Sequence, residues 1–535
     1  MTSPSTPPVV SGGQAAGTRA AGGQATRARL SARLGRDAGP AWLMAIPPLV
    51  TFVIMLWGIG GASYWRDEAA TISAAQRPLG NLLHTLGNID AVHGAYYLLI
   101  WVMVQVGGSG ELVTRLPSAV AMACAAVAVV AIGRRLISPW AGLASGLVFA
   151  ILPEVSLYGQ DARPYAIVVA LAALASYLLV RVMDAGPGAR HRWLIGYALS
   201  LAALGIVDIF GLFLITGHAV TVGLRCLRET GTARPDRPGA AAPGRAERVR
   251  DARSLALGWL AAAVAGCLLT SPVLALGYVQ RGTLSWLTPP NFAAITGLHD
   301  LVGPVAMSVA VILVIAAGLV VSALLGRGRL RANWPGSLPA LCLPWLILPP
   351  AILLVASVIT PVYTLRYVLL CIPAIALLAG AGLASLGWVA GPAALLVIAL
   401  LGVPMQLQVR ASNGHVDNVR RADRIVANNM RPGDAVLEYK AENFAQAYPY
   451  GIRQLIPIAQ AESPIQSATL VGTFLPDPVV RQRLTHVSRV WVVEYGRRTP
   501  LVILNGLHFR LIRAWHVSDI WLYLYEHPVI PGAAP

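Results

Sequence analysis

Two acidic side chains stand next to each other just after the first long apolar run of the sequence. Asp67 and Glu68 follow Arg66 in a more polar stretch between residues 62 and 113. Charged groups at the edge of an apolar phase are costly unless they are paired or used. A carboxylate there can act as a general base, taking the proton from a hydroxyl as its oxygen attacks an electrophilic carbon. The structural alternative is equally open: one acid caps a helix that begins near Ala69, with Arg66 as its ion-pair partner.

A second polar cluster runs from Tyr158 to Tyr165, between two further apolar runs. In it, Arg163 directly precedes Pro164, a residue that favours the first turn of a helix. The guanidinium of Arg163 can bind a phosphate or a carboxylate there through two parallel hydrogen bonds. In the structural alternative, Asp161 caps the next helix and pairs with Arg163.

A third cluster, Pro361 to Tyr367, precedes another apolar run and contains Arg366. An arginine at this depth either extends to the lipid headgroups or turns inward to bind an anion, and the sequence fits both. Two other polar residues have simpler interpretations. We expect His218 to be a hydrogen-bonded core histidine and Asp208 to be a helix cap rather than a base.

Apolar helices must position these clusters. Of the 535 residues, 56% are hydrophobic and 12% are charged, whereas soluble domains carry about a quarter charged residues. A soluble protein is therefore excluded, and the chain is expected to be a multi-pass membrane protein. The formal net charge of +17 would suggest a nucleic acid partner in a soluble chain. Here most of the excess is arginine in short loops between apolar runs, which indicates membrane topology and no nucleic acid partner.

About eleven transmembrane helices are expected, because a helix crosses a bilayer in about 20 apolar residues. A further apolar run from Ala95 to Val106 is too short to cross, and we expect it to lie in the outer leaflet. The expected spans cover residues 40–60, 113–133, 139–157, 162–183, 193–207, 209–225, 254–279, 298–325, 338–359, 366–388 and 390–407.

The arginines of the loops test this arrangement. If residues 95–106 do not cross, the basic connections all fall on the cytoplasmic side; a crossing there would move Arg134 and Arg135 outside. These connections are Arg134-Arg135, Arg190 with Arg192, and the stretches 225–253 and 327–331. The arginine-containing segment 1–40 shows no hydrophobic periodicity and is expected to be a disordered cytoplasmic tail.

The predicted fold is an all-α polytopic membrane domain followed by a small α/β domain. The membrane domain covers residues 41–407 with an external loop at 61–112, and by parity residues 408–535 lie on the extracytoplasmic side. In this last part we expect a helix over residues 416–430 and strands over 435–439, 489–495, 509–515 and 520–525.

In this topology all three polar clusters fall on the outer side of the membrane. Carboxylates, a histidine and two arginines therefore converge on one face. A membrane-embedded site that handles an anionic lipid-linked substrate would need this set of side chains.

The order and spacing of these residues resemble the glycosyltransferases of the GT-C fold. More narrowly, they are similar to the bacterial protein O-mannosyltransferase and aminoarabinose transferase superfamily. The resemblance covers about residues 41–400 and is strongest over 61–170. It rests on Asp67-Glu68, His93-Gly94, Tyr96-Tyr97, Arg115-Leu116-Pro117-Ser118-Ala119, Gly133-Arg134-Arg135, Asp161-Ala162-Arg163-Pro164-Tyr165 and Arg366-Tyr367.

This resemblance implies an enzyme of the plasma membrane that moves a sugar from a polyprenyl-phosphate carrier, with inversion, to a hydroxyl at the outer face. Asp67 would be the catalytic base, and Glu68 would orient Asp67 or the acceptor. Arg366 would contact the carrier phosphate, and His93 would lie near the sugar or the phosphate. The implied substrate-binding residues are Arg66, His93, Tyr96, Asp161, Arg163, Tyr165, Arg366 and Tyr367.

No cofactor is required by this chemistry, because a lipid phosphate leaves as a stable anion. Some relatives of the fold use a metal, and Asp67, Glu68 and Asp161 could hold a divalent ion. The expected partners are a polyprenyl-phosphate sugar, the lipid bilayer, and a hydroxyl of a glycan, lipid or protein. Abundant Ala, Gly and Arg with a single lysine, Lys440, indicate a high-GC bacterial genome, for which mannose or arabinose is the expected sugar.

Two other classes of function compete with this one. A transporter or flippase of lipid-linked sugars would favour charges near the bilayer midplane and two related halves with interrupted helices. The charges here gather instead at the outer mouth, and no related halves are evident. A membrane anchor that presents residues 408–535 as a binding module would leave Asp67 and Glu68 unexplained.

Overall fold

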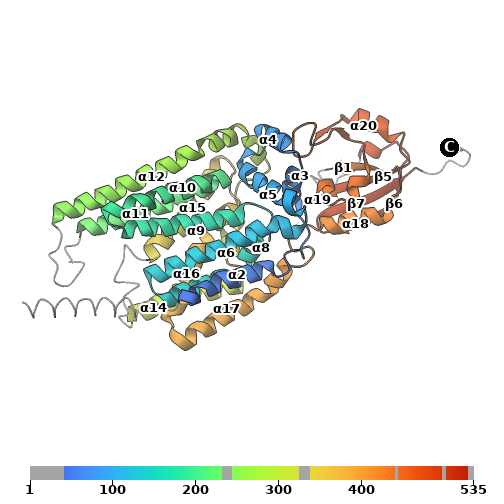
Figure 1. The fold of residues 1–535 in the computed structure, drawn as a ribbon. Helices are drawn as coiled ribbons and strands as arrows, with labels where there is room; N and C mark the ends of the chain where they lie inside the picture. The colour runs from blue at the N-terminus through green and yellow to red at the C-terminus, as the bar shows by residue number, and fades with distance from the viewer. Residues whose placement is uncertain (1–40, 232–243, 325–337, 440–443, 497–501, 528–535) are drawn as a thin grey trace, which may run out of the picture.

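Apolar helices and one small sheet make up the computed structural model of the protein. It describes residues 41–231, 244–324, 338–439, 444–496 and 502–527. The tail expected over residues 1–40 lies outside the described residues. The helices form an elongated bundle, and the sheet lies beyond one end of it (Figure 1).

Apolar helices build the bundle, and most of them run in roughly one direction (Figure 1). They are α2 (Ile46–Leu56), α6 (Glu111–Leu136), α7 (Pro139–Ile151), α8 (Pro153–Gly159), α9 (Tyr165–Asp184), α10 (Pro187–Val207), α11 (Leu214–Gly231), α12 (Arg245–Val279), α14 (Val305–Leu324), α15 (Leu338–Ile359), α16 (Ile372–Ser385) and α17 (Gly387–Val409). Helix α6 packs against both α7 and α9, and α7 packs against α16.

Seven of the described helices are long and apolar enough to cross a membrane, or up to nine if two bent pairs each count as one span. One bent pair is α7 with α8, which meet at 63°. Every span expected from the sequence falls on helical segments, so the helical membrane fold is confirmed, whereas the number eleven stays a prediction. The short run at 95–106 forms α5 (Gly94–Gly107), which is shorter than the spans.

Small residues allow the central helices to approach each other closely. A Cβ atom on Gly380 of α16 would lie 2.2 Å from the backbone nitrogen of Ser145 on α7. Only glycine fits at such a contact, which is typical of helices packed in a membrane. Since η6 (Leu365–Cys371) leads directly into α16, this packing also holds η6 over the end of the bundle.

Between α2 and α6 the chain forms short helices at the end of the bundle, next to the sheet (Figure 1). They are α3 (Arg66–Ala75), α4 (Leu79–Asn88), η2 (Ala91–His93) and α5. The start of α3 has two side-chain caps: Glu68 accepts from the backbone nitrogen of Trp65, and Asp417 accepts from that of Arg66. Helix α3 therefore begins before Ala69 and carries Asp67 and Glu68 in its first turn, where negative charge is favourable.

A five-stranded sheet is the centre of the C-terminal domain. Strand β1 pairs in parallel with β2 and β5, whereas β7 is antiparallel to both β5 and β6. Strand β5 is buried over nearly its whole length, as the apolar run from Val490 to Val493 favours. The strand order is β2 (Ile456–Pro457), β1 (Ala435–Tyr439), β5 (Arg489–Tyr495), β7 (Ile520–Glu526) and β6 (Arg510–Val517).

Three helices and a hairpin complete this domain. They are α18 (Val419–Asn429), α19 (Phe444–Ala447), α20 (Asp477–Leu484) and the pair β3 (Gln460–Glu462) with β4 (Thr473–Phe474). The four strands expected from the sequence correspond to β1, β5, β6 and β7, and the expected helix corresponds to α18. The predicted α/β fold of this part is therefore confirmed.

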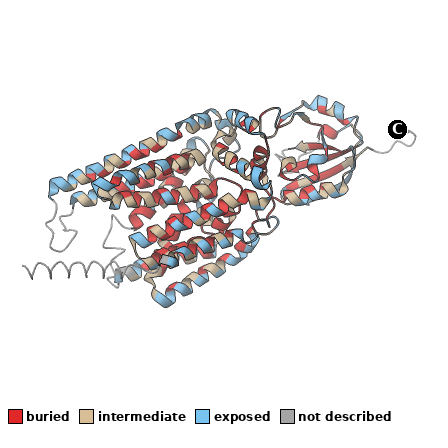
Figure 2. Ribbon diagram, in the orientation of Figure 1, coloured by how far each residue is buried: buried red, intermediate tan, exposed pale blue. Residues whose placement is uncertain are grey.

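Helix α3 joins the two parts of the molecule. Its Ala69 and Ile72 are fully buried in the same apolar core as Val419 and Trp491 of the C-terminal domain. Buried residues accordingly occur both in the bundle and in the short helices that meet the sheet (Figure 2). The segment that carries Asp67 is thus fixed between two packed bodies.

Candidate active site

A cavity of about 410 Å³ lies at the end of the bundle next to the C-terminal domain. Its walls come from α3, η2, α5, the turn before α9, η3 (Ile209–Phe213), η4 (Arg281–Leu284), η6 and residues 469–471. The three polar clusters singled out in the sequence therefore meet in one place. The polar lining includes Asp67, His93, Tyr97, Arg163, Asp208 and Arg366.

Asp67 is the second residue of α3 and lines the cavity among three arginines. Arg366 Nη1 donates a hydrogen bond to Asp67 Oδ2, and Arg66 Nε lies 3.6 Å from Oδ1. Burial alone would raise the pKa of Asp67, but the charges of Arg163, Arg366 and Arg66 outweigh burial and hold this pKa below its usual value. The side chain remains 20% exposed. Asp67 is therefore an ionised carboxylate that a ligand in the cavity can reach.

Arg163, His93 and Asp90 form a connected polar chain along the cavity wall. Arg163 Nη2 lies 3.0 Å from His93 Nε2, and His93 Nδ1 lies 2.8 Å from Asp90 Oδ1. Because a guanidinium only donates, His93 accepts at Nε2 and donates from Nδ1 to Asp90. The hydroxyl of Tyr97 donates to the second oxygen of Asp90. This chain fixes the direction of the Arg163 guanidinium.

Arg366 lies on the cavity wall near the rings of two tryptophans, of which Trp286 also lines the cavity. Its guanidinium carbon is 5.6 Å from the ring centroid of Trp65 and 5.3 Å from that of Trp286, within the range of a cation–π interaction. Arg366 therefore faces inward, and the alternative of an arginine extended to the headgroups does not apply. The next residue, Tyr367, stacks on Phe210 with centroids 4.4 Å apart. Aromatic surfaces beside two arginines suit a ligand that is partly anionic and partly apolar.

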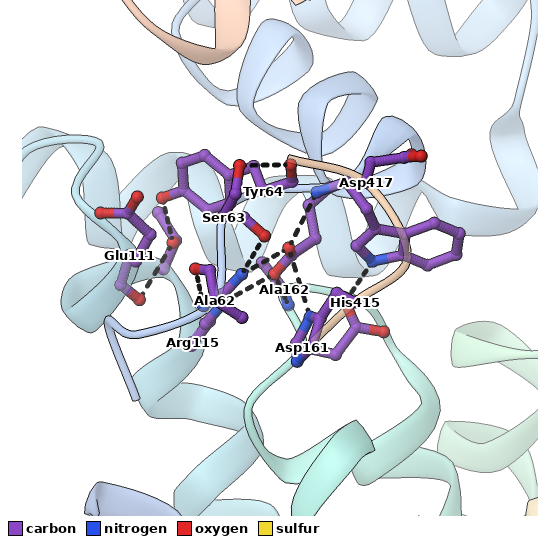
Figure 3. Close-up of polar contacts among 12 residues, drawn as sticks. Ala62, Ser63, Tyr64, Glu111, Arg115, Asp161, Ala162, His415 and Asp417 are labelled. Atoms are coloured by element: carbon purple, nitrogen blue, oxygen red, sulfur yellow. Dashed lines mark hydrogen bonds and ion pairs between the residues drawn. The ribbon is translucent and has the colours of Figure 1, made fainter. Parts of the chain in front are cut away.

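Glu68 does not line this cavity and instead pairs with Arg115, whose polar surroundings Figure 3 shows. Arg115 of α6 donates to both of its oxygens, from Nε to Oε1 at 2.8 Å and from Nη2 to Oε2 at 2.6 Å. Both side chains are 0% exposed. Burial alone would raise the pKa of Glu68, but Arg115 holds it well below its usual value. The structural alternative is therefore right for Glu68 as a cap of α3 but wrong for its ion-pair partner, which is Arg115 of α6 and not Arg66.

Asp161 adjoins this buried ion pair (Figure 3). Trp65 Nε1 donates to Asp161 Oδ1 at 3.0 Å. Burial and the nearby charge of Glu68 raise the pKa of Asp161 well above its usual value, which favours the protonated form. The expectation that Asp161 caps α9 is wrong, because Pro164 stands at that N-cap.

Within the described residues, one group of side chains has the spacing of a metal site. Ligand atoms of Glu68, Asp161 and His415 all lie within 4.8 Å of one another. However, both oxygens of Glu68 already accept hydrogen bonds from Arg115, which supplies the positive charge that an ion would bring. Asp67 is not in this group, so Asp67, Glu68 and Asp161 do not form a common ligand set.

The structure brings most of the expected site residues together, but not all of them. Arg66, His93, Arg163, Tyr165, Arg366 and Tyr367 line the cavity with Asp67, whereas Glu68 and Asp161 lie behind its wall. Tyr96 is buried against α6, with its hydroxyl 3.4 Å from Ser118 Oγ, and does not line the cavity.

Several lining residues were not identified from the sequence as part of the site. Asp208 caps η3, as expected, by accepting from the nitrogen of Phe210 at 2.9 Å, but it also lines the cavity. Burial raises the pKa of Asp208 to about 6. The position of Asp90, three residues before His93, could have indicated from the sequence that the two side chains pair. Nothing in the sequence around Trp286 indicates that it belongs to the site, since its segment has no polar motif.

Part of the chain matches a known protein family. Residues 94–215 match a family model described as dolichyl-phosphate-mannose-protein mannosyltransferase. A comparison with curated protein sequences found no match.

The chain is similar in structure to ArnT from Cupriavidus metallidurans. For the apo state the identity is 14%, the similarity covers 90% of this chain and 97% of that one, and the TM-score is 0.56. For ArnT bound to undecaprenyl phosphate the identity is 15%, the similarity covers 93% of this chain and 100% of that one, and the TM-score is 0.55. At such identities the likeness concerns the fold. The structural similarity confirms the GT-C fold that the sequence predicts. Together with the family match, it confirms the predicted glycosyltransferase class.

Proposed function

We propose that the protein transfers a sugar, with inversion, from a polyprenyl-phosphate carrier to an acceptor hydroxyl at the outer face of the plasma membrane. The observation that carries this proposal is the position of Asp67, an ionised carboxylate beside Arg163 and Arg366 on the wall of one cavity. Asp67 and the two arginines are then close enough for one to act on the acceptor hydroxyl while the others bind the leaving phosphate. The similar ArnT, in a structure with undecaprenyl phosphate, supports a lipid phosphate as the carrier.

In the proposed reaction Asp67 acts as general base. It takes the proton of the acceptor hydroxyl while the hydroxyl oxygen forms a bond to the anomeric carbon of the sugar. The bond between that carbon and the phosphate oxygen breaks on the opposite side, and its electron pair leaves with the lipid phosphate. Arg366 and Arg163 stabilise the charge that develops on the leaving oxygen.

The ion pair of Arg366 with Asp67 gives the donor a second role. Arg366 donates to one of the two carboxylate oxygens of Asp67. A carrier phosphate competes for this guanidinium, because two parallel hydrogen bonds to a phosphate are at least as favourable. Binding of the donor then frees this oxygen as well, which makes Asp67 a stronger base when a sugar is in place.

The sugar and the side of the membrane belong to the same proposal. The arginines of the loops support a cytoplasmic N-terminus and an extracytoplasmic C-terminal domain. Mannose or an arabinose-like sugar is proposed as the transferred group. A flippase is disfavoured because α3 and α5, which carry part of the described polar cluster, lie at one end of the bundle rather than midway along it (Figure 1).

Substitution Asp67→Asn tests the proposal. It keeps the shape of the side chain and removes the base, so transfer from a polyprenyl-phosphate sugar in membranes should fall by about 10²–10⁴-fold. The exposed Glu247→Gln at the opposite end of α12 serves as the control and should keep wild-type activity. Wild-type transfer by the Asp67 variant at normal expression would remove Asp67 as the base.

A further inference from the structure

The C-terminal domain has a cavity of its own, of about 480 Å³. This volume is in the range of sites for small ligands. Strands β1 and β2, helices α19 and α20, and the hairpin β3–β4 surround it. Its polar and aromatic lining includes Glu438, Gln446, Arg453, Gln460, Phe474 and Asp477.

Sheet topology explains why the cavity is there. Strand β2 ends at Pro457, which pairs with Val436, whereas β1 continues to Tyr439. The chain after β1 leads to β2 on one side and then returns to β5 on the other. Crevices at the carboxyl ends of parallel strands, where connections diverge in this way, are common ligand sites in α/β domains.

The side chains of this cavity suit a polyhydroxylated ligand. Among the described residues, Glu438, Gln446 and Arg453 form no side-chain hydrogen bond or ion pair that would occupy them. Burial raises the pKa of Glu438 to about 7, so its carboxyl can accept or donate near neutral pH. Phe474 is 52% exposed and offers an apolar ring face. Carboxylate, amide and guanidinium groups beside such a ring match the hydroxyls and apolar faces of sugars.

This cavity and the one that holds Asp67 share a wall. Val471 lines both of them. The segment around it is fastened to the membrane part, because Asn81 donates to the oxygen of Ile465 at 2.7 Å and Arg77 donates to that of Leu470 at 3.4 Å. The two cavities are therefore neighbours, with Val471 between them.

We propose that the cavity of the C-terminal domain binds the acceptor, and that this acceptor is a glycan whose growing end reaches past Val471 to Asp67. This inference rests on the proposed function and names the acceptor class for it. A site of this kind would let the enzyme recognise sugars already present on the acceptor while the catalytic cavity handles only the last hydroxyl.

The test measures binding rather than transfer. Full-length protein in detergent is labelled and applied to an array that carries oligosaccharides, including mannose and arabinose oligomers, together with serine- and threonine-containing peptides. Glu438→Gln and Phe474→Ala are compared with the wild type. Glu462→Gln, an exposed acid on β3 outside the cavity, is the matched control.

We expect retention on particular oligosaccharides, weakened about tenfold or more by Glu438→Gln, because a hydrogen bond to a charged group is lost. Phe474→Ala should weaken it as well, and Glu462→Gln should not. Because the array measures binding and not transfer, a failure of the proposed catalysis remains distinguishable from a failure of this site. Binding to peptides alone, no binding to any oligosaccharide, or equal binding by all variants would overturn the inference.

Discussion

Two ionic clusters begin at neighbouring residues of α3 and differ in what can reach them. The open cluster, Asp67 with Arg366 and Arg163, lines a cavity and is partly exposed. The closed cluster, Glu68 with Arg115, is fully buried, and the protein's own backbone supplies its other partners, such as the nitrogen of Ala162 that donates to Glu68. Charges that a ligand can reach can exchange partners, which catalysis needs, whereas an enclosed pair can only hold elements in place. Residue type alone therefore does not separate function from architecture here.

The largest effect on stability is expected when the closed cluster is broken. Arg115→Met leaves Glu68 buried without its partner, which costs about 3–5 kcal/mol. Thermal unfolding of the purified protein should show a large loss of stability, and activity should disappear together with the fold. Asp67→Asn in the same assay should unfold like the wild type. Equal stability of the Arg115 variant and the wild type would mean that the two clusters do not differ as described.

In the open cluster, Arg366→Met should weaken donor use without unfolding the protein. Loss of a charge-assisted contact to phosphate is expected to raise KM for the polyprenyl-phosphate sugar by about 10–100-fold. Because Arg366 helps to hold the pKa of Asp67 down, its removal raises that pKa. On acidification, the variant should therefore lose activity at a higher pH than the wild type does. Kinetics as a function of pH measures both effects. Arg192→Met, beside Trp193 on α10, is the control; an unchanged KM for Arg366→Met would contradict the phosphate contact.

Asp161→Asn should have a small effect, although the residue is an acid close to Asp67. Its raised pKa favours the neutral carboxyl, which the amide imitates, and the amide oxygen can still accept from Trp65. We expect transfer to change by less than about tenfold, or ~1.4 kcal/mol. A raised pKa in the folded state also means that stability falls as the pH rises through it, so the variant should lose less stability at alkaline pH than the wild type. A loss of activity as large as that of Asp67→Asn would place Asp161 in the open cluster.

The smallest effect is expected from removal of metal ions. Arg115 already neutralises Glu68, and Arg366 pairs with Asp67 at the cavity wall. Treatment with EDTA should therefore leave both transfer and thermal unfolding unchanged. A loss that zinc, manganese or magnesium restores would show that Glu68, Asp161 and His415 hold an ion after all.

Local patterns in the sequence predict much of this fold. Strands β1, β5 and β7 are found within a residue of their expected positions, because apolar and aromatic runs between turn residues specify buried strands. Helical spans follow from apolar length in the same way. The start of α3 was placed too late, because its cap, Asp417, comes from a segment about 350 residues away.

The sequence predicts which residues of the site have suitable chemistry, but not which of them face the cavity. Asp67, Arg163 and Arg366 were found because charges in apolar surroundings need a use. Which of two adjacent tyrosines faces the cavity depends on the rotation of α5, and a short helix that is apolar all around gives no signal for it. Glu68 and Asp67 have the same chemistry in the sequence, and only the position of Arg115 separates them.

The shared core around α3 also determines when during synthesis this helix can reach its final position. One face of α3 is completed by Val419 and Trp491, and its first turn is capped by Asp417. During synthesis, the helix that carries Asp67 is made early, whereas its cap Asp417 follows about 350 residues later. Asp67 is therefore expected to reach its final position only after the C-terminal domain has been made, so that unfinished chains stay inactive.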